Sequence, residues 1–199
     1  MPRKKAFDES AVLAKARDLF WERGYTATSI GDLEKALGIS RSSIYASFGD
    51  KRALYDKTLA AYQHENLGRL KITLDETSDL RKTLHELFLS AATIKNTACQ
   101  TGSRGCYVVN ATTEMANACP EALNFVVANR KRFVVTMQDA LARAQVQGTL
   151  DEQADPTDLA NYLFVCYNGL QVVVQTGIER EALIKAVRHG VDALPWKIG

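Results

Sequence analysis

Proline and long apolar runs are scarce in this chain. It has four prolines in 199 residues, and an ordinary 46% of its residues are hydrophobic. Few prolines, together with plentiful alanine, leucine, lysine, arginine and glutamate, favour helices over strands. No segment approaches the roughly 20 apolar residues that span a bilayer, and the start of the sequence lacks the apolar core of a signal peptide. We therefore expect an all-α protein that works in the cytoplasm, with no membrane partner.

Cysteine and histidine are too few and too widely spaced for a metal centre. Cys99, Cys106, Cys119 and Cys166 are separated by 7, 13 and 47 residues, without a C-x-x-C pair. Zinc sites use closely spaced ligand pairs, and a reducing compartment disfavours disulfides. We expect free thiols, no metal and no cofactor.

Enzyme motifs are missing as well. The three histidines, His64, His85 and His189, stand in no recognisable catalytic arrangement. The chain has neither the G-x-x-x-x-G-K-[ST] loop that cradles phosphates nor the H-E-x-x-H helix of metalloproteases. A helical enzyme is therefore only the second hypothesis.

The net charge of +2 is too small to indicate a nucleic-acid partner, but the charge is unevenly distributed. Residues 1–60 carry eleven Lys/Arg against eight Asp/Glu, a local +3, which leaves about −1 for the remainder. Much of the excess lies in Arg3, Lys4 and Lys5. Three such charges are often only a solvated terminus. We include them among the candidate DNA contacts.

Apolar spacing predicts about nine helices and no strands. Val12, Ala16, Leu19 and Phe20 follow the i, i+4, i+7, i+8 spacing of an amphipathic helix that ends before Gly24. Glycine, proline and polar clusters separate the other segments. After this helix over 7–23, the expected helices span 28–37, 40–46, 51–73, 79–98, 105–116, 119–147, 156–176 and 179–193.

The stretch TSIGDLEKALGISRSSIYASFGDKRAL, residues 28–54, predicts a helix-turn-helix with its turn at Gly38. In this motif the first helix braces the second, which can then be short and polar and enter the DNA major groove. An ordinary helical hairpin with solvated polar residues has the same spacing, so the spacing alone leaves both interpretations open. The buried seam would consist of Ile30, Leu33, Leu37, Ile39 and Ile44.

The outward face of the second helix carries the candidate DNA contacts. Arg41, Ser42 and Ser43 lie near its N-terminus, where an arginine can fork onto guanine and a serine can bond to bases or phosphates. Thr28, Tyr45 and Lys51 are placed to hold flanking phosphates. The full predicted set is Arg3, Lys4, Lys5, Thr28, Ser40, Arg41, Ser42, Ser43, Tyr45 and Lys51.

The longer stretch RGYTATSIGDLEKALGISRSSIYASFGDKRALYDKTL resembles the N-terminal domain of the TetR family of bacterial transcriptional regulators. The shared features are the GY pair, T-x-I opening the second helix, G-I-S at the turn, Y-x-x-F closing the third and D-K-x-x-L opening the fourth. The match covers residues 8–60. Glu34 departs from it, because the family usually has a small residue there for close helix approach.

The resemblance implies a homodimer that places two recognition helices in successive major grooves of a palindromic operator. It also implies a repressor whose C-terminal domain binds a small-molecule inducer and then moves the fourth helix, so that the recognition helices no longer match the groove spacing. The expected division is a DNA-binding domain over 1–50 and a ligand-binding and dimerisation domain over 51–199.

The last two predicted helices carry the apolar stripes of a possible dimer interface. Repeated by a two-fold axis, such a pair would form a four-helix bundle. The same faces could instead pack within their own subunit. The predicted interface residues are Leu159, Leu163, Cys166, Leu170, Val173, Leu183, Val187 and Val191.

The segment GCYVVNATTEMA mixes apolar and polar residues and suggests part of a ligand site. Asn110 is its first candidate, because a buried amide needs a hydrogen-bonding partner. Aromatic side chains and a methionine would supply apolar walls, although each of them could be plain core. The candidates are Phe88, Cys106, Asn110, Thr113, Phe125, Phe133, Met137 and Tyr162.

A more specific hypothesis concerns the thiol of Cys106. RGCYVVN is similar to a segment in electrophile- and oxidant-sensing members of the family, where a cysteine after a glycine reacts with the inducer. Arg104 is nearby, and the first turn of a helix favours a thiolate. The same Gly-Cys pair occurs in members with no known redox role, and free cysteines are often simply buried. Sensing and core packing both remain open for this thiol.

A third hypothesis is an architectural DNA-binding protein without ligand control. About 140 residues beyond position 60 are not basic, and they need a purpose other than phosphate contact. The first hypothesis is therefore a ligand-responsive DNA-binding repressor, ahead of a helical enzyme and an architectural protein.

Overall fold

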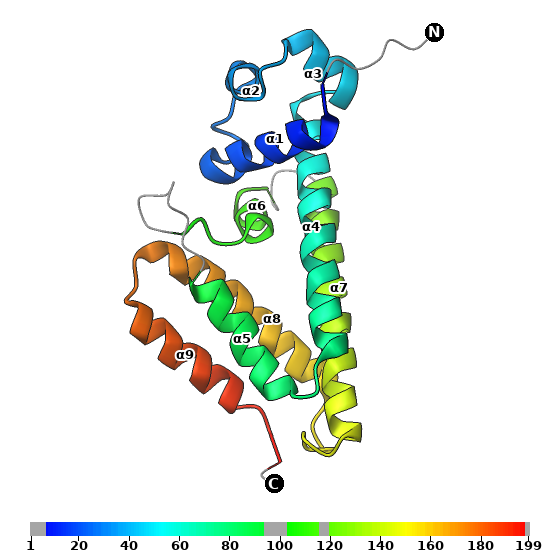
Figure 1. Cartoon of the computed structure of the whole chain (residues 1–199), viewed down its shortest axis with the longest axis vertical. Coiled ribbons are helices and arrows are strands. Elements are labelled where there is room, and N and C mark those ends of the chain that lie inside the picture. The colour runs from blue at the N-terminus through cyan, green and yellow to red at the C-terminus, as the bar shows by residue number, and fades with distance from the viewer. Residues whose placement is uncertain (1–6, 94–102, 116–119, 198–199) are drawn as a thin grey trace. The chain divides into compact units, whose positions relative to one another are not determined.

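The computed structural model describes residues 7–93, 103–115 and 120–197. These residues form nine α-helices, one short 3₁₀ helix and no strand, apart from a single antiparallel bridge between Leu150 and Trp196 (Figure 1). The all-α prediction is confirmed. The helices are α1 (Glu9–Arg23), α2 (Ile30–Leu37), α3 (Arg41–Phe48), α4 (Lys51–Glu76), α5 (Leu80–Thr93), α6 (Tyr107–Met115), α7 (Pro120–Val146), α8 (Pro156–Val173), η1 (Val174–Thr176) and α9 (Arg180–Asp192).

The helix ends differ from the expected ones by a few residues. The third helix continues to Phe48, because its C-cap is Gly49, whose φ of 88° suits glycine. The helix expected over 156–176 changes to 3₁₀ geometry at Val174. The far end of the helix expected over 79–98 lies outside the described residues.

The chain divides into two compact units, residues 1–64 and 65–199. Helices α1 to α3 and the first part of α4 belong to the first unit. The rest of α4 and helices α5 to α9 belong to the second.

The core of the first unit is small and partly aromatic. Phe20 from α1 contacts Tyr55 from α4 edge to face, with ring centroids 5.0 Å apart. Leu33 of α2 and Ile44 of α3 are fully buried, as expected for the seam of a helix-turn-helix. Burial of these side chains fixes α2 and α3 against the longer helices, which short helices need because they are marginal alone.

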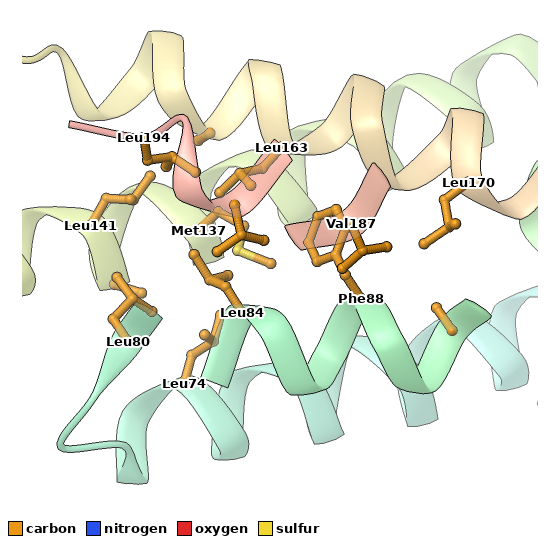
Figure 2. Close-up of a cluster of buried hydrophobic side chains, with 14 of the residues drawn as sticks. Leu74, Leu80, Leu84, Phe88, Met137, Leu141, Leu163, Leu170, Val187 and Leu194 are labelled. Carbon is orange, nitrogen blue, oxygen red and sulfur yellow. The ribbon is translucent and has the colours of Figure 1, made fainter. Parts of the chain in front are cut away.

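The core of the second unit is larger and mainly aliphatic, with Phe88 and Phe133 among its buried side chains (Figure 2). Helix α7 packs along α8, α5 packs on α8 and α9, and α6 packs on α7 and α8. Leu84, Met137 and Leu163 meet between α5, α7 and α8, each with at most 2% of its surface exposed. This packing determines which faces of α8 and α9 remain outside.

Five residues predicted for a dimer interface are buried within the subunit. Each is at most 9% exposed, because the apolar stripes of α8 and α9 face α5 and α7 of the same chain. That part of the prediction is wrong. The five are Leu163, Leu170, Leu183, Val187 and Val191.

A polar contact joins α5 to the end of α9. Arg81 Nη2 donates to Asp192 Oδ1 at 2.8 Å, and His85 Nε2 lies 3.0 Å from the same oxygen. The hydrogen bonds from Arg81 and His85 hold the pKa of Asp192 below its ordinary value. This contact connects α5 to the end of α9.

None of the described helices is both long enough and apolar enough to cross a membrane.

Candidate nucleic-acid interface and ligand region

The turn between α2 and α3 is built from local hydrogen bonds. Ser29 caps α2 and forms a capping box with Asp32, whose pKa is lowered mainly by the Ser29 hydroxyl. Gly38 ends α2 in the left-handed region, with a φ of 69°. Ser40 then caps α3, its Oγ accepting from Ser43 N at 3.2 Å. The two helices are thus set in place by residues between them.

The outward face of α3 is polar and accessible. The Arg41 side chain is 58% exposed and Tyr45 is 46% exposed. Ser42 is exposed and Ser43 is half-buried. Their hydroxyls lie 2.9 and 3.0 Å from Ser40 Oγ. This exposure is what DNA contact requires, and the contacts themselves stay predictions.

Glu34, which departs from the family pattern, bridges α2 and α3. Its Oε1 accepts a hydrogen bond from Arg41 N at 2.6 Å, and its Oε2 lies 3.6 Å from Arg41 Nε. The carboxylate therefore satisfies an N–H at the start of α3 that has no acceptor within the helix.

Thr28 and Lys51 have structural roles that the sequence did not suggest. Thr28 is fully buried and its hydroxyl donates to Gly24 O at 2.6 Å. Lys51 Nζ donates to Tyr25 O at 2.8 Å and Thr28 O at 2.7 Å, and lies 4.2 Å from the centre of the Tyr25 ring. These side chains brace the loop before α2, so we withdraw their assignment as phosphate contacts. Arg3, Lys4 and Lys5 lie outside the described residues.

Gly105 brings the start of α6 very close to α8. Its φ is +62°, and a β-carbon there would lie 2.5 Å from Gln171 O and closer still to the Gln175 side-chain amide. Cys106 follows it and precedes α6, with its carbonyl accepting from Asn110 N at 2.9 Å. The Cys106 thiol is buried, and the residue stands at the N-cap of α6 rather than in the first turn.

Polar side chains surround the close contact between Gly105 and α8. Asn110 Nδ2 donates to Arg104 O at 2.9 Å, and Asn110 Oδ1 accepts from Gln175 Nε2 at 3.2 Å. Burial raises the pKa of Tyr167 well above its ordinary value, and the nearby Cys106 adds to the rise while a hydrogen bond with Gln171 opposes it. Asn110 is half-buried, and both the oxygen and the nitrogen of its amide have hydrogen-bond partners.

An apolar cavity of about 260 Å³ lies between α5, α8 and α9. Phe88 lines it and also packs edge to face on Tyr167, with ring centroids 5.8 Å apart, so the cavity adjoins the region around Cys106. Its other walls include Leu163, Cys166, Leu170, Val187 and Val191. Most of the predicted dimer residues therefore line this cavity.

The remaining ligand candidates divide into core and surface positions. Phe133 and Met137 are buried in the core of the second unit, and Phe125 is half-buried. Thr113 is exposed and its hydroxyl donates to Asn110 O. Tyr162 is 41% exposed, with its hydroxyl 3.4 Å from Gly190 O. Thr113 and Tyr162 thus lie at the surface, and a ligand contact at either residue stays a prediction.

Among the residues that the structure describes, no group of three or more histidine, cysteine, aspartate or glutamate side chains could hold a metal ion. Neither Cys106 nor Cys166 is in a disulfide, and Cys99 and Cys119 lie outside the described residues.

Two family models match most of the chain. Residues 12–58 match the bacterial regulatory proteins of the tetR family, and residues 82–190 match the Tetracyclin repressor-like C-terminal domain. The second match alone covers more than half of the chain. The chain belongs to the TetR family. It is a helix-turn-helix DNA-binding transcriptional regulator, not an enzyme.

Relatives within the TetR family extend over nearly the whole chain. The HTH-type transcriptional repressor ComR of Escherichia coli (strain K12) is 29% identical over 187 residues, covering 92% of this chain and 87% of ComR. The TetR-family regulator CifR, solved as a cysteine mutant with 26-base-pair operator DNA, is 27% identical with a TM-score of 0.83, covering 97% of this chain and 100% of that one. The reduced form of E. coli NemR, 17% identical with a TM-score of 0.84 and coverage of 96% and 98%, shares the fold.

Sequence reasoning about this TetR-family regulator missed Gln171 and Gln175. Gln171 is 4% exposed, and both residues contact the Gly105–Asn110 segment. Two glutamines four residues apart in the apolar run LQVVVQT were the available signal, because such a pair shares one helix face.

Proposed function

We propose that this regulator is a homodimeric repressor that binds a palindromic operator through α3 and releases it when a small molecule acts on its C-terminal unit. The observation that carries the proposal is the exposed polar face of α3, where the Arg41 side chain is 58% exposed. Ser40 caps this helix, and its buried side chains pack on the other helices of the first unit. ComR, a repressor, and CifR, a protein solved on operator DNA, support it. The proposal places the protein in the cytoplasm with its DNA target.

In this proposal α3 lies in the major groove and Arg41 forks onto a guanine, with Ser42 and Ser43 bonding to bases or phosphates. Tyr45 contacts a flanking phosphate. The amino-terminal Arg3, Lys4 and Lys5 add sequence-independent phosphate contacts.

The dimer interface is proposed on the outward face of α8 rather than on its buried stripe. Tyr162, Val165 and Val172 are 41%, 68% and 45% exposed, and with Gly169 they follow the spacing of one helix face. Large exposed apolar side chains on one face mark an interaction surface. Val173 and Cys166, both in the predicted interface, border this face, while Leu159 is half-buried.

Val165→Glu tests the interface, because a charge at its centre cannot be buried without a partner. Sedimentation should show a dimer for the wild type and a monomer for Val165→Glu. Val135→Glu is a matched control on α7, where Val135 is 54% exposed. A dimeric Val165→Glu would reject this face.

For induction, we propose that Cys106 adds to an electrophile such as a quinone. The sulfur forms a bond to a ring carbon of the quinone, and the thiol proton ends on the quinone oxygen. Support comes from the burial of Cys106 next to Gly105, which lies against α8, because an adduct on a buried sulfur has to displace neighbouring atoms. The alternative is that a small apolar molecule occupies the cavity lined by Phe88.

Operator release by quinones or aldehydes separates these two modes of induction. Cys106→Ser should resist release if the thiol reacts, and mass spectrometry of the wild type should show one adduct at Cys106. Cys166→Ser is the control for the second described thiol. If the wild type and Cys106→Ser release the operator equally, the thiol is not the inducer site, and binding in the cavity is the mode of induction that stands.

Selection of bound fragments from random DNA by the purified protein tests operator binding itself. The recovered sequences should be palindromic, and affinity for them should fall steeply with salt. Arg41→Ala should weaken specific binding by about 1–3 kcal/mol, whereas Arg188→Ala, an equal change of charge on α9, should leave operator preference intact. An Arg41→Ala variant with wild-type preference would show that α3 is misassigned as the reading helix.

A further inference from the structure

The Glu34 carboxylate contacts both the backbone N–H and the guanidinium of Arg41, the residue proposed to contact operator bases. One oxygen accepts the Arg41 backbone N–H at 2.6 Å, and the other lies 3.6 Å from Arg41 Nε. The first contact is short and acts as a second cap on α3. The second contact is longer than a hydrogen bond, so the guanidinium is held only loosely.

This pair lies on the surface and can therefore exchange partners. The Glu34 side chain is 34% exposed and that of Arg41 is 58% exposed, beside Ser42 on the same polar face. Exposed ion pairs contribute little to stability, because water and salt screen them. Arg41 can leave Glu34 at small cost when a better acceptor is offered.

DNA offers Arg41 two kinds of acceptor. Phosphates attract any exposed cation whatever the sequence, whereas guanine O6 and N7 accept the fork of an arginine only where guanine occurs. A carboxylate beside Arg41 neutralises the long-range attraction and repels phosphates near the start of α3. The carboxylate weakens binding less where Arg41 gains two hydrogen bonds to a guanine, because those bonds offset the repulsion.

We propose that Glu34 is a specificity-determining residue that suppresses binding of Arg41 to non-operator DNA. This inference rests on the operator binding proposed above. The repulsion acts on both kinds of DNA, but the lost contact between Arg41 and phosphate affects only the non-specific complex. Glu34 therefore increases the ratio of operator affinity to non-specific affinity.

Glu34→Gln in the full chain separates charge from capping. Glutamine keeps an oxygen that can accept the Arg41 N–H but has no charge, so α3 stays capped. Glu34→Ala removes both and shows whether the binding effect persists without the cap. Glu22→Gln, at an exposed position on α1, makes the same change of net charge away from Arg41.

The measurement compares two fluorescent duplexes of equal length: the palindrome recovered by selection and a shuffled version of it. Glu34→Gln should bind the shuffled duplex roughly threefold to tenfold more tightly, with a salt slope steeper by about 0.9, as one more neutralised phosphate predicts. The palindrome should gain less, so the affinity ratio should fall about threefold or more. Glu34→Ala should lower the ratio in the same direction.

An unchanged ratio in Glu34→Gln, or an equal fall in Glu22→Gln, overturns the role of Glu34. A wild-type protein that prefers no palindrome overturns the proposed operator binding instead, so the two failures can be distinguished. Circular dichroism on all variants verifies that they are folded before binding is compared.

Discussion

The helix-turn-helix in the first unit and the bundle in the second are stabilised in different ways. Helices α2 and α3 have eight residues each and depend on caps, a left-handed glycine and a few buried side chains. Helices α7 and α8 have 27 and 18 residues and depend on a continuous aliphatic core (Figure 2). Local signals therefore define the first region, and contacts between distant residues define the second.

The largest loss of stability is expected from shortening a side chain in the core of the second unit. Leu141→Ala should lower the free energy of unfolding by about 2–5 kcal/mol, because a fully buried leucine leaves a cavity in the bundle. Chemical denaturation gives the value, with Val146→Ala, at 89% exposure, as the matched control. A loss below 1 kcal/mol would mean that the bundle is less tightly packed than we describe.

Gly105→Ala tests a place where the bundle depends on a glycine as strictly as the helix-turn-helix does. Its added β-carbon would overlap Gln171 O and Gln175, besides the strain of its positive φ, so we expect a loss of about 2–4 kcal/mol. Gly148→Ala has a similar φ of +75° with open space around it, and should lose only about 1 kcal/mol. Equal losses in the two variants would show that the close approach to α8 is not required.

Ser29→Ala tests the caps of the first unit. Losing the capping box with Asp32 should cost about 1 kcal/mol, measured by thermal unfolding. Ser78→Ala, at an exposed position between α4 and α5, should be neutral. A neutral Ser29→Ala would indicate that burial of Leu33 and Ile44 alone holds α2 and α3.

The smallest effect is expected at Asp192, which is on the surface of the bundle. Its lowered pKa means that its contribution to stability is fully present above about 3.8 and is lost as the pH falls through the lower folded-state value. Asp192→Asn should thus be slightly less stable at pH 7 and lose less stability on acidification. Melting curves from pH 7 to pH 2 test this, with Asp139→Asn on α7 as the control. An identical acid response in wild type and Asp192→Asn would contradict the role of the Arg81 contact.

Some roles could not be predicted because the side chains involved act across the turn or across helices. Lys51 has the same charge whether it contacts DNA or, as found, the carbonyls of Tyr25 and Thr28. Glu34 was noticed only as an exception to a pattern, and its contact with Arg41 depends on how α2 and α3 cross.

The sequence by itself determined the helices, the capped turn at Gly38 and the polar face of α3, because caps, glycines and apolar spacing act between residues close along the chain. Only the tertiary structure decided which apolar stripe of α8 is buried. Leu163 and Val165 are both apolar, yet one is 1% and the other 68% exposed. Periodicity identifies apolar faces but not what covers them, since that depends on helices far away in the sequence.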